Sequence, residues 1–169
     1  MTVDIELQTL LRADELGIRL EIVRGLPLWE AQPVVRHQRA IDRIRSTIQP
    51  TPPTGAHDSG CGCVHLADVY VHFPDGSLKR PDISLFCREP DEEEDAVQLV
   101  PEAVIEVVSR GFEAKDLEIG PPFYLNQGVK DVIVFDPATL LVLHVQRTAA
   151  RRYTSPVDLT LLCGCTCRV

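Results

Sequence analysis

The chain has 169 residues, 44% of them hydrophobic and 25% charged, an ordinary globular composition that predicts a single domain over residues 1–169. The formal net charge of −8 disfavours tight, non-specific binding to nucleic acid, because proteins that depend on phosphate contacts are usually basic or carry a basic stripe. The sequence has no apolar run of the roughly 20 residues that span a bilayer and no secretory signal, so we expect a cytoplasmic protein without a membrane partner.

The first third of the chain predicts helices around a short hairpin. Leucine and isoleucine recur at helical spacing near the start, and apolar and charged residues then alternate up to a turn at Arg24-Gly25. The next helix has an apolar face formed by His37 and three isoleucines, with arginines over the rest of its surface. The expected elements are a helix over residues 5–16, strands over 18–23 and 26–29, a helix over 35–48 and a loop over 50–60.

The rest of the chain predicts strands with one helical stretch between them. Pro74-Asp75-Gly76 is a hairpin signal, and the acidic run 91–95 is expected in an exposed loop. The expected elements are strands over 63–73, 78–87 and 102–109, a helical stretch over 113–127, and strands over 131–136, 140–147 and 153–168. With the helices of the first third, these elements predict an α/β (α+β) fold in which helices flank a mixed central sheet.

Two carboxylates interrupt neighbouring apolar strands. Asp82 stands at the start of the apolar run 82–86, and Glu106 lies 24 residues later inside the run 104–108. An isolated ionised carboxylate is costly to bury unless something compensates its charge, and a divalent cation shared by both residues is one such compensation. Since side chains alternate along a strand, Glu106 is expected to point with its neighbours two positions away into a half-buried cleft. The pair is therefore a candidate metal site.

Several segments around these carboxylates occur in a recognisable order. They are Leu20-Glu21-Ile22-Val23-Arg24-Gly25, His37-Gln38-Arg39, Asp75-Gly76 before Arg80-Pro81-Asp82, residues 100–109, Asp116-Leu117, Tyr124, Gly128-Val129 and Asp136-Pro137. In this order they resemble the PD-(D/E)XK nuclease superfamily and, within it, the Uma-type restriction-endonuclease-like proteins. The resemblance extends over residues 18–147 and implies a restriction-endonuclease-like fold.

The resemblance also implies an activity and a cofactor, namely an endonuclease that hydrolyses phosphodiester bonds of DNA with Mg²⁺ or Mn²⁺. Asp82 and Glu106 would bind the ion together with the carbonyl oxygen of Val107, and waters would complete the octahedral oxygen shell that Mg²⁺ demands. The ion would activate a water and neutralise charge on the scissile phosphate. A homodimer is expected, because cutting both strands with one site per chain favours two-fold symmetry.

The chain departs from the family pattern at the catalytic lysine. The pattern calls for lysine either two residues after the strand glutamate, where the chain has Val108, or on the next helix, where it has Gly120. Lys115 is the nearest substitute, and we predict that it is the third catalytic residue and orients the attacking water or stabilises the transition state. Lys79 is a poorer candidate, because strand alternation should turn it away from the face that carries Asp82.

Other interpretations of these residues stay open. Asp82 can cap a turn at the entry to a strand, and Glu106 can form a structural ion pair with an arginine of helix 35–48. For His37, a satisfied position in the core is preferred to a role near the site. Glu21 matches the family hairpin and is a candidate for supporting the site. The alternative function is that of a catalytically inactive nuclease-fold protein with a binding or regulatory role.

Six cysteines form a separate pattern, Cys61-Gly62-Cys63, Cys87 and Cys163-Gly164-Cys165-Thr166-Cys167. The two Cys-Gly-Cys pairs suggest a four-thiolate zinc site that joins residue 61 to the C-terminal segment, although paired ligands of structural zinc sites are usually separated by two to four residues. Disulfides are not expected in a cytosolic chain. Reduced, buried cysteines are therefore preferred to structural Zn²⁺.

Overall fold

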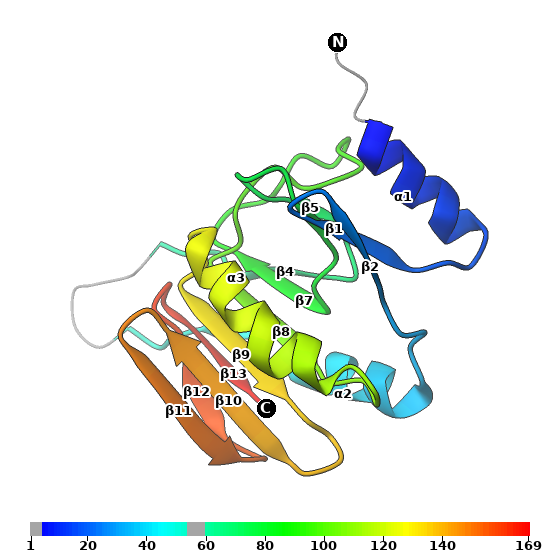
Figure 1. The fold of residues 1–169 in the computed structure, drawn as a ribbon. Helices are drawn as coiled ribbons and strands as arrows, with labels where there is room; N and C mark the ends of the chain where they lie inside the picture. The colour runs from blue at the N-terminus through cyan, green and yellow to red at the C-terminus, as the bar shows by residue number, and fades with distance from the viewer. Residues whose placement is uncertain (1–4, 54–59) are drawn as a thin grey trace.

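The computed structural model describes residues 5–53 and 60–169, with helices packed against both faces of a central sheet (Figure 1). The helices are α1 (Ile5–Glu15), α2 (Val35–Arg45), the π-helical segment η1 (Lys115–Ile119) and α3 (Gly120–Asn126), which continues η1. Within these ranges, none of the helices has the length and apolar character needed to cross a bilayer.

The central sheet is mixed and has six strands. In spatial order they are β11 (Ala149–Thr154), β10 (Leu141–Gln146), β9 (Asp131–Phe135), β8 (Ala103–Val107), β7 (Ile83–Phe86) and β4 (Val64–Ala67). β8 and β9 are parallel, whereas the other neighbouring pairs are antiparallel. Every residue of β8 and β9 is buried, as expected for strands in the middle of a sheet that is covered on both faces.

Two smaller antiparallel sheets lie beside the central one. The first has the order β2 (Leu26–Trp29), β1 (Leu20–Val23), β6 (Leu78–Lys79) and β5 (Val71–His72), and the second has the order β12 (Asp158–Thr160), β13 (Cys165–Arg168) and β3 (Gln49–Pro50). The chain passes from β6 in the first small sheet to β7 in the central sheet through Arg80-Pro81-Asp82. The second small sheet brings the C-terminal segment beside the residues that follow α2.

Alternation along β8 separates two layers of the core. Ala103, Ile105 and Val107 belong to one hydrophobic cluster with the apolar residues of α2, whereas Val104 and Val108 belong to another with the aromatic residues of α3. This is the two-residue period expected of a strand, and it gives each helix its own face of the sheet.

The predicted fold class is confirmed, but some predicted elements are divided. Residues 63–73 and 78–87 each pass from one sheet to another, so that β4 pairs with β7 in the central sheet while β5 and β6 form the expected hairpin. Residues 153–168 contain the end of β11 and then β12 and β13 rather than one strand. Of the predicted loop over 50–60, Pro50 belongs to β3, and residues 54–59 lie outside the described residues.

The cysteines differ from the prediction of reduced thiols. Cys61 is bonded to Cys87, and Cys63 is bonded to Cys165, whereas Cys163 and Cys167 are free and buried. The preference for six reduced cysteines is therefore wrong for four of them. The prediction rested on the redox compartment, whereas the fold brings the start of β4 and the end of β7 next to the β12–β13 turn.

Candidate active site

Asp82 lies where the chain leaves the first small sheet and enters β7. Its backbone N–H donates to Oε2 of Glu106 (3.2 Å), and its Oδ2 accepts a hydrogen bond from the backbone N–H of Val107 (2.7 Å). These contacts follow from the antiparallel register of β7 and β8, in which Ile83 stands opposite Ile105. The structure thus brings together the three residues predicted to hold a metal ion, and their metal-binding role stays a prediction.

Glu106 is buried on the α3 side of β8. Its Oε1 accepts a short hydrogen bond from the hydroxyl of Tyr124, and none of the ion pairs among the described residues includes it. Burial raises the pKa of Glu106 well above its usual value, and the negative charges of Asp82 and Asp116 raise it further. The alternative of an ion pair with an arginine of α2 is therefore not realised, and no lysine or arginine among the described residues pairs with the carboxyl.

His37 reaches the same point from the first turns of α2. Its Nε2 lies 2.9 Å from the carbonyl oxygen of Val107 and 3.2 Å from Oδ2 of Asp82. Because a carbonyl oxygen can only accept, Nε2 carries the hydrogen. Burial alone would lower the pKa of His37, but the hydrogen bond and charge of Asp82 outweigh it and raise the pKa. His37 is buried as predicted, yet the preference for a core position away from the site is wrong.

Asp116 is a further carboxylate at the site, and it lies in η1. Burial raises its pKa to about 6, with a smaller contribution from the charge of Asp82. The π-helical turn forms because the N–H of Gly120 bonds to the carbonyl of Lys115, five residues back, and the two prolines that follow have no N–H to continue the pattern. A turn with one extra residue places Lys115 and Asp116 side by side at the cleft.

Next to the carboxylates, two lysines and two glutamates form a network of ion pairs in which opposite charges are in contact. Oε2 of Glu21 contacts Nζ of Lys79 at 2.8 Å and Nζ of Lys115 at 3.2 Å, and Lys115 also lies 3.2 Å from Oε1 of Glu30. Burial opposes ionisation of Glu21, but the two lysines and the backbone N–H of Arg80 hold its pKa below the usual range. Glu30 has a raised pKa of about 8, because it is buried and lies beside the charge of Glu21.

Lys115 lines the cleft that also contains Asp82 and Glu106, as its predicted role requires. Burial would lower its pKa, but the attraction of Glu21 and of Glu30 outweighs burial and raises the pKa, and Glu106 contributes to the rise. Among the described residues its ion pairs are with Glu21 and Glu30, not with Asp82 or Glu106. Its catalytic role stays a prediction.

The alternation argument that made Lys79 a poorer candidate does not apply. Lys79 ends β6 in the first small sheet, whereas Asp82 precedes β7 in the central sheet, so alternation along a single strand does not relate their side chains. Lys79 is 3% exposed, and its ammonium lies 5.2 Å from the ring centroid of Tyr124. Its charge also acts on Glu106, whose pKa it lowers somewhat. Lys79 is therefore part of the electrostatic surroundings of the site, beneath the cleft rather than in its lining.

Gly120, where the family pattern has lysine, packs closely against the π-helical turn. A Cβ atom at this position would lie 3.3 Å from the carbonyl oxygen of Lys115 and 3.7 Å from Cε2 of Tyr124. The first distance is tighter than an ordinary contact, so a side chain here would require the Lys115 carbonyl to shift by a few tenths of an ångström. The glycine and the position of Lys115 thus belong to one local arrangement.

The cleft gathers side chains from the two ends of the β1–β2 hairpin, from β8 and the residue before β7, and from α2 and η1. Its lining residues are Arg19, Glu30, Ala31, Pro33, His37, Asp82, Glu106, Val107, Ser109, Phe112, Lys115 and Asp116. Sequence reasoning named Asp82, Glu106, Val107 and Lys115 as site residues. It passed over Glu30, for which the sequence has no signal, and gave no role to Asp116, which was noticed within a family segment.

A mixed sheet flanked by helices, with an aspartate before one strand and a glutamate within its neighbour, is the arrangement that the resemblance to PD-(D/E)XK nucleases predicts. The sequence profile of the Uma2 family, described as "putative restriction endonuclease", matches residues 6–162, and the chain belongs to this family. The predicted family membership is thus confirmed.

One solved structure supports the same fold. It is the crystal structure of "a putative nuclease belonging to DUF820" from Anabaena variabilis, which is 17% identical in sequence. The similarity covers 92% of this chain and 88% of that chain, with a TM-score of 0.67. At this identity the similarity bears on the fold, and it agrees with the predicted central sheet. Comparison with curated proteins gave no match.

Proposed function

We propose that the protein is a nuclease that hydrolyses phosphodiester bonds in DNA and depends on Mg²⁺ or Mn²⁺. The observation that carries the proposal is the adjacent pair of Asp82 and Glu106 at the cleft. Among the described residues neither carboxylate forms an ion pair with lysine or arginine. Burial and the charge of Asp82 favour the protonated form of Glu106, and a divalent ion that replaces this proton compensates the charge of both carboxylates.

The donors in the cleft fit a hard divalent cation. The carboxylate oxygens of Asp82 and Glu106 and the carbonyl oxygen of Val107 are of the kind that Mg²⁺ prefers, and the remaining positions suit waters. An ion taken by two of these oxygens would compete with the N–H of His37, which contacts Val107 and Asp82. When bound, the ion supplies an acidic water and neutralises charge on the phosphate.

Lys115 is the residue that we propose to act on the reacting phosphate. Its ammonium lines the cleft, and Glu21 and Glu30 both hold it at 3.2 Å. A cation fixed in this way need not reorganise when negative charge develops in the transition state, which is the condition for effective electrostatic catalysis. Glu21 and Glu30 would therefore act as positioning residues for Lys115 rather than as metal ligands.

A DNA substrate is supported by a basic track that begins at the cleft. The cleft shares Ala31, His37 and Ser109 with an adjoining hollow, and that hollow shares Arg36 and Pro137 with a third one along α2. The exposed arginines in these hollows are Arg36, Arg39, Arg43 and Arg110. They offer a path for a phosphate backbone despite the net charge of −8.

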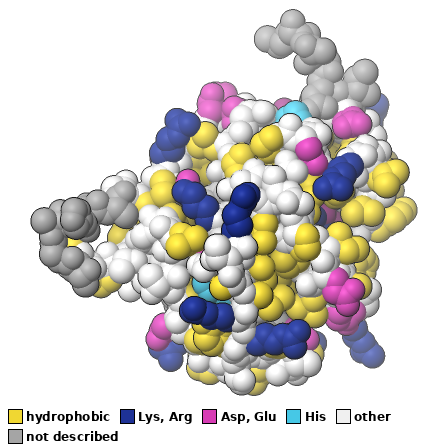
Figure 2. Space-filling view, turned by 60° about the vertical axis from the view of Figure 1, so that its left-hand side comes forward, with side chains coloured by type: hydrophobic (Ala, Val, Ile, Leu, Met, Phe, Trp, Pro, Cys, Tyr) yellow, Lys and Arg dark blue, Asp and Glu magenta, His cyan; other side chains and the backbone are white. Residues whose placement is uncertain are grey.

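The exposed arginines of these hollows are concentrated along α2 and are not spread evenly over the surface. In Figure 2, lysine and arginine side chains on another face of the molecule are scattered among acidic and hydrophobic ones instead of forming a continuous band. The acidic run 91–95 is exposed, as predicted. We therefore expect weak non-specific binding, with DNA directed to the side of the molecule that carries the arginines of α2.

The test is a cleavage assay on supercoiled plasmid and short duplexes with Mg²⁺ or Mn²⁺. Asp82→Asn and Glu106→Gln should abolish cleavage and remove divalent binding measured by calorimetry. Asp158→Asn, which changes a carboxylate that is 77% exposed, should alter neither. If the wild type binds the ion yet cuts no DNA, the result would favour the alternative function, that of an inactive nuclease-fold protein. If both site variants bind the ion normally, the metal site is wrong.

The expected homodimer is part of the same proposal, since two sites related by two-fold symmetry can cut both strands. Light scattering of the protein in the presence of a short duplex should give the mass of two chains per duplex. A single chain per duplex, combined with nicking of one strand, would contradict the dimer without affecting the metal site.

A further inference from the structure

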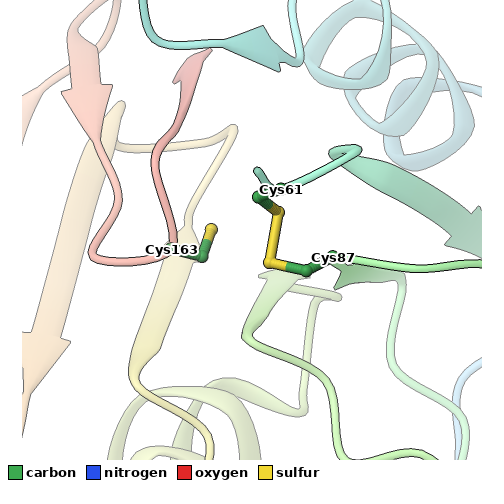
Figure 3. A group of neighbouring side chains, drawn as sticks. All are labelled: Cys61, Cys87 and Cys163. Atoms are coloured by element: carbon green, nitrogen blue, oxygen red, sulfur yellow. A yellow bond between two sulfur atoms is a disulfide. The ribbon is translucent and has the colours of Figure 1, made fainter. Parts of the chain in front are cut away.

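The sulfur atoms of five cysteines converge at one place, outside the cleft. Sγ of Cys61, Cys87 and Cys163 all lie within 4.8 Å of one another, and so do Sγ of Cys61, Cys63 and Cys165. Cys61 belongs to both groups, so its Sγ lies within 4.8 Å of each of the other four sulfurs. Figure 3 shows Cys163 on a separate segment, opposite the Cys61–Cys87 pair. Two disulfides use four of these sulfurs, and the fifth, Cys163, stands against one of them without being bonded.

The backbone around the sulfurs is shaped to bring them together. The N–H of Gly62 donates to the carbonyl of Cys87 (2.8 Å), and a Cβ atom at Gly62 would lie 3.1 Å from that carbonyl oxygen. Cys63 has a φ of +49°, in the left-handed region that residues other than glycine rarely adopt. Gly164, with a φ of +94°, turns the chain between Cys163 and Cys165.

Sulfurs that are not bonded to one another also lie near the spacing of a metal site. A tetrahedral zinc ion with Zn–S bonds of about 2.3 Å needs its sulfurs about 3.8 Å apart. Sγ of Cys165 lies 3.5 Å from Sγ of Cys61, although the two residues belong to different disulfides. Sγ of Cys61, Cys87 and Cys163 form one group within 4.8 Å, and Cys165 adds a fourth sulfur next to Cys61. Four thiolates on segments far apart in the sequence are the usual ligand set of a structural zinc site.

We propose that the reduced protein binds one Zn²⁺ ion through the thiolates of Cys61, Cys87, Cys163 and Cys165. Two equivalents of a dithiol reductant convert both disulfides to four thiols and are themselves oxidised to disulfides. Three of these thiols and the free thiol of Cys163 then bind Zn²⁺ as thiolates, and the protons that the four ligands carried are released to the solvent. The thiol of Cys63 stays protonated. Thiolate sulfur is a soft ligand that selects zinc rather than magnesium, so the site is chemically distinct from the carboxylate cleft.

The site would join three parts of the fold. Cys61 precedes β4 and Cys87 follows β7 in the central sheet, whereas Cys163 and Cys165 belong to the turn and strand of the C-terminal sheet. An ion at this place ties the C-terminal sheet to the edge of the central sheet. Because the binding free energy of a structural metal is folding free energy, removal of the ion from reduced protein should lower its melting temperature.

The experiment uses the wild-type chain reduced without oxygen, incubated with Zn²⁺ and freed of excess metal by gel filtration. Elemental analysis should give one zinc per chain, and Co²⁺ in its place should give the intense visible bands of tetrahedral thiolate coordination. A zinc content well below one per chain, with all six thiols still reactive, would overturn the proposal, as would iron in place of zinc. These measurements need no variant and no activity.

Variants then assign the ligands. Cys87→Ser and Cys163→Ser should each lose the ion, whereas Cys167→Ala, a change at a buried thiol that belongs to neither group, should keep it. Circular dichroism of each variant checks that it is folded. Retention of zinc by folded Cys163→Ser would overturn the proposal, because Cys163 has no role in the disulfides. Loss of zinc in Cys63→Ser but not in Cys165→Ser would overturn the assignment of the fourth ligand.

Discussion

Glu21 and Glu106 are both buried glutamates near one cleft, but the protein treats their charges in opposite ways. Glu21 contacts two lysines and a backbone N–H, which hold its pKa low. Glu106 accepts from a tyrosine hydroxyl and one backbone N–H, and burial and neighbouring carboxylates raise its pKa. The first glutamate has its cations built into the fold, whereas the second pairs with no lysine or arginine among the described residues.

This difference distinguishes a glutamate that stabilises the fold from one that is placed to bind a ligand. A buried ion pair that is complete organises the structure around it, and loss of one partner is costly. A buried carboxylate without a cation costs stability in the apo protein, and such a cost is typical of positions that bind a ligand. The same substitution, glutamate to glutamine, should therefore have opposite effects at the two positions.

The largest effect is expected at Glu21. Glu21→Gln leaves Lys79 buried without its carboxylate partner, and breaking a buried pair in this way typically costs about 3–5 kcal/mol. Urea unfolding at pH 7 should show the loss as a lower midpoint with an unchanged slope. An unfolding free energy equal to that of the wild type would mean that the charge of Glu21 is not what compensates Lys79.

The next effect tests Lys115 and rests on the proposed nuclease activity. Lys115→Ala should reduce kcat by about a hundred- to a thousand-fold, corresponding to about 3–4 kcal/mol of electrostatic stabilisation, while divalent affinity stays nearly the same. Lys130→Ala is the matched control, because Nζ of Lys130 pairs with Glu102 at a position that is 54% exposed. Equal turnover of the two variants would remove Lys115 from the mechanism.

A smaller effect of opposite sign is expected at Glu106. Glu106→Gln keeps an acceptor for Tyr124 and removes a carboxylate that is costly to ionise, so the metal-free protein should gain about 1–2 kcal/mol at pH 7. The wild type should lose stability as pH rises from the unfolded value of about 4.3 towards the raised folded pKa, because the folded state retains a proton that the unfolded state has released. This pH dependence should be reduced in Glu106→Gln, as measured by urea unfolding without metal.

The smallest expected effect is the pH dependence of ion binding. A divalent ion competes with the proton of Glu106, and below pH 6 with that of Asp116, whose pKa is raised to about 6. Affinity should therefore increase with pH, by up to about tenfold per unit for each proton displaced. Calorimetry in two buffers of different ionisation enthalpy counts these protons. Asp116→Asn should remove only the part below pH 6.

The sequence predicted the fold, and it predicted which carboxylates come together at the cleft, where local patterns decide the structure. Alternation along β8 correctly placed Glu106, and the apolar face of α2 correctly placed His37 in a buried position. It could not show that His37 reaches Val107, because that contact depends on how α2 packs against the end of β8. Single-domain organisation over residues 1–169, dimerisation and cytoplasmic location stay predictions.

Errors arose where the chain changes sheet. The sequence pattern of residues 78–87 predicts one strand and cannot show that the chain leaves one sheet and enters another at Arg80-Pro81-Asp82, and this crossing invalidated the argument about Lys79. Likewise, spacing alone could not show that Cys87 joins the cysteines of residues 61–63, because their proximity comes from pairing of β4 with β7.

The π-helical turn of η1 has a consequence for how the chain can vary in length. A residue in an α-helix turns by about 100° about the axis, so deletion of one residue within 115–119 would rotate Lys115 and Asp116 by that angle relative to α3. Lys115 would then leave both Glu21 and Glu30. The exposed loop over 91–95 imposes no such condition. Insertions and deletions among relatives should therefore accumulate in that loop and spare the short segment between β8 and α3.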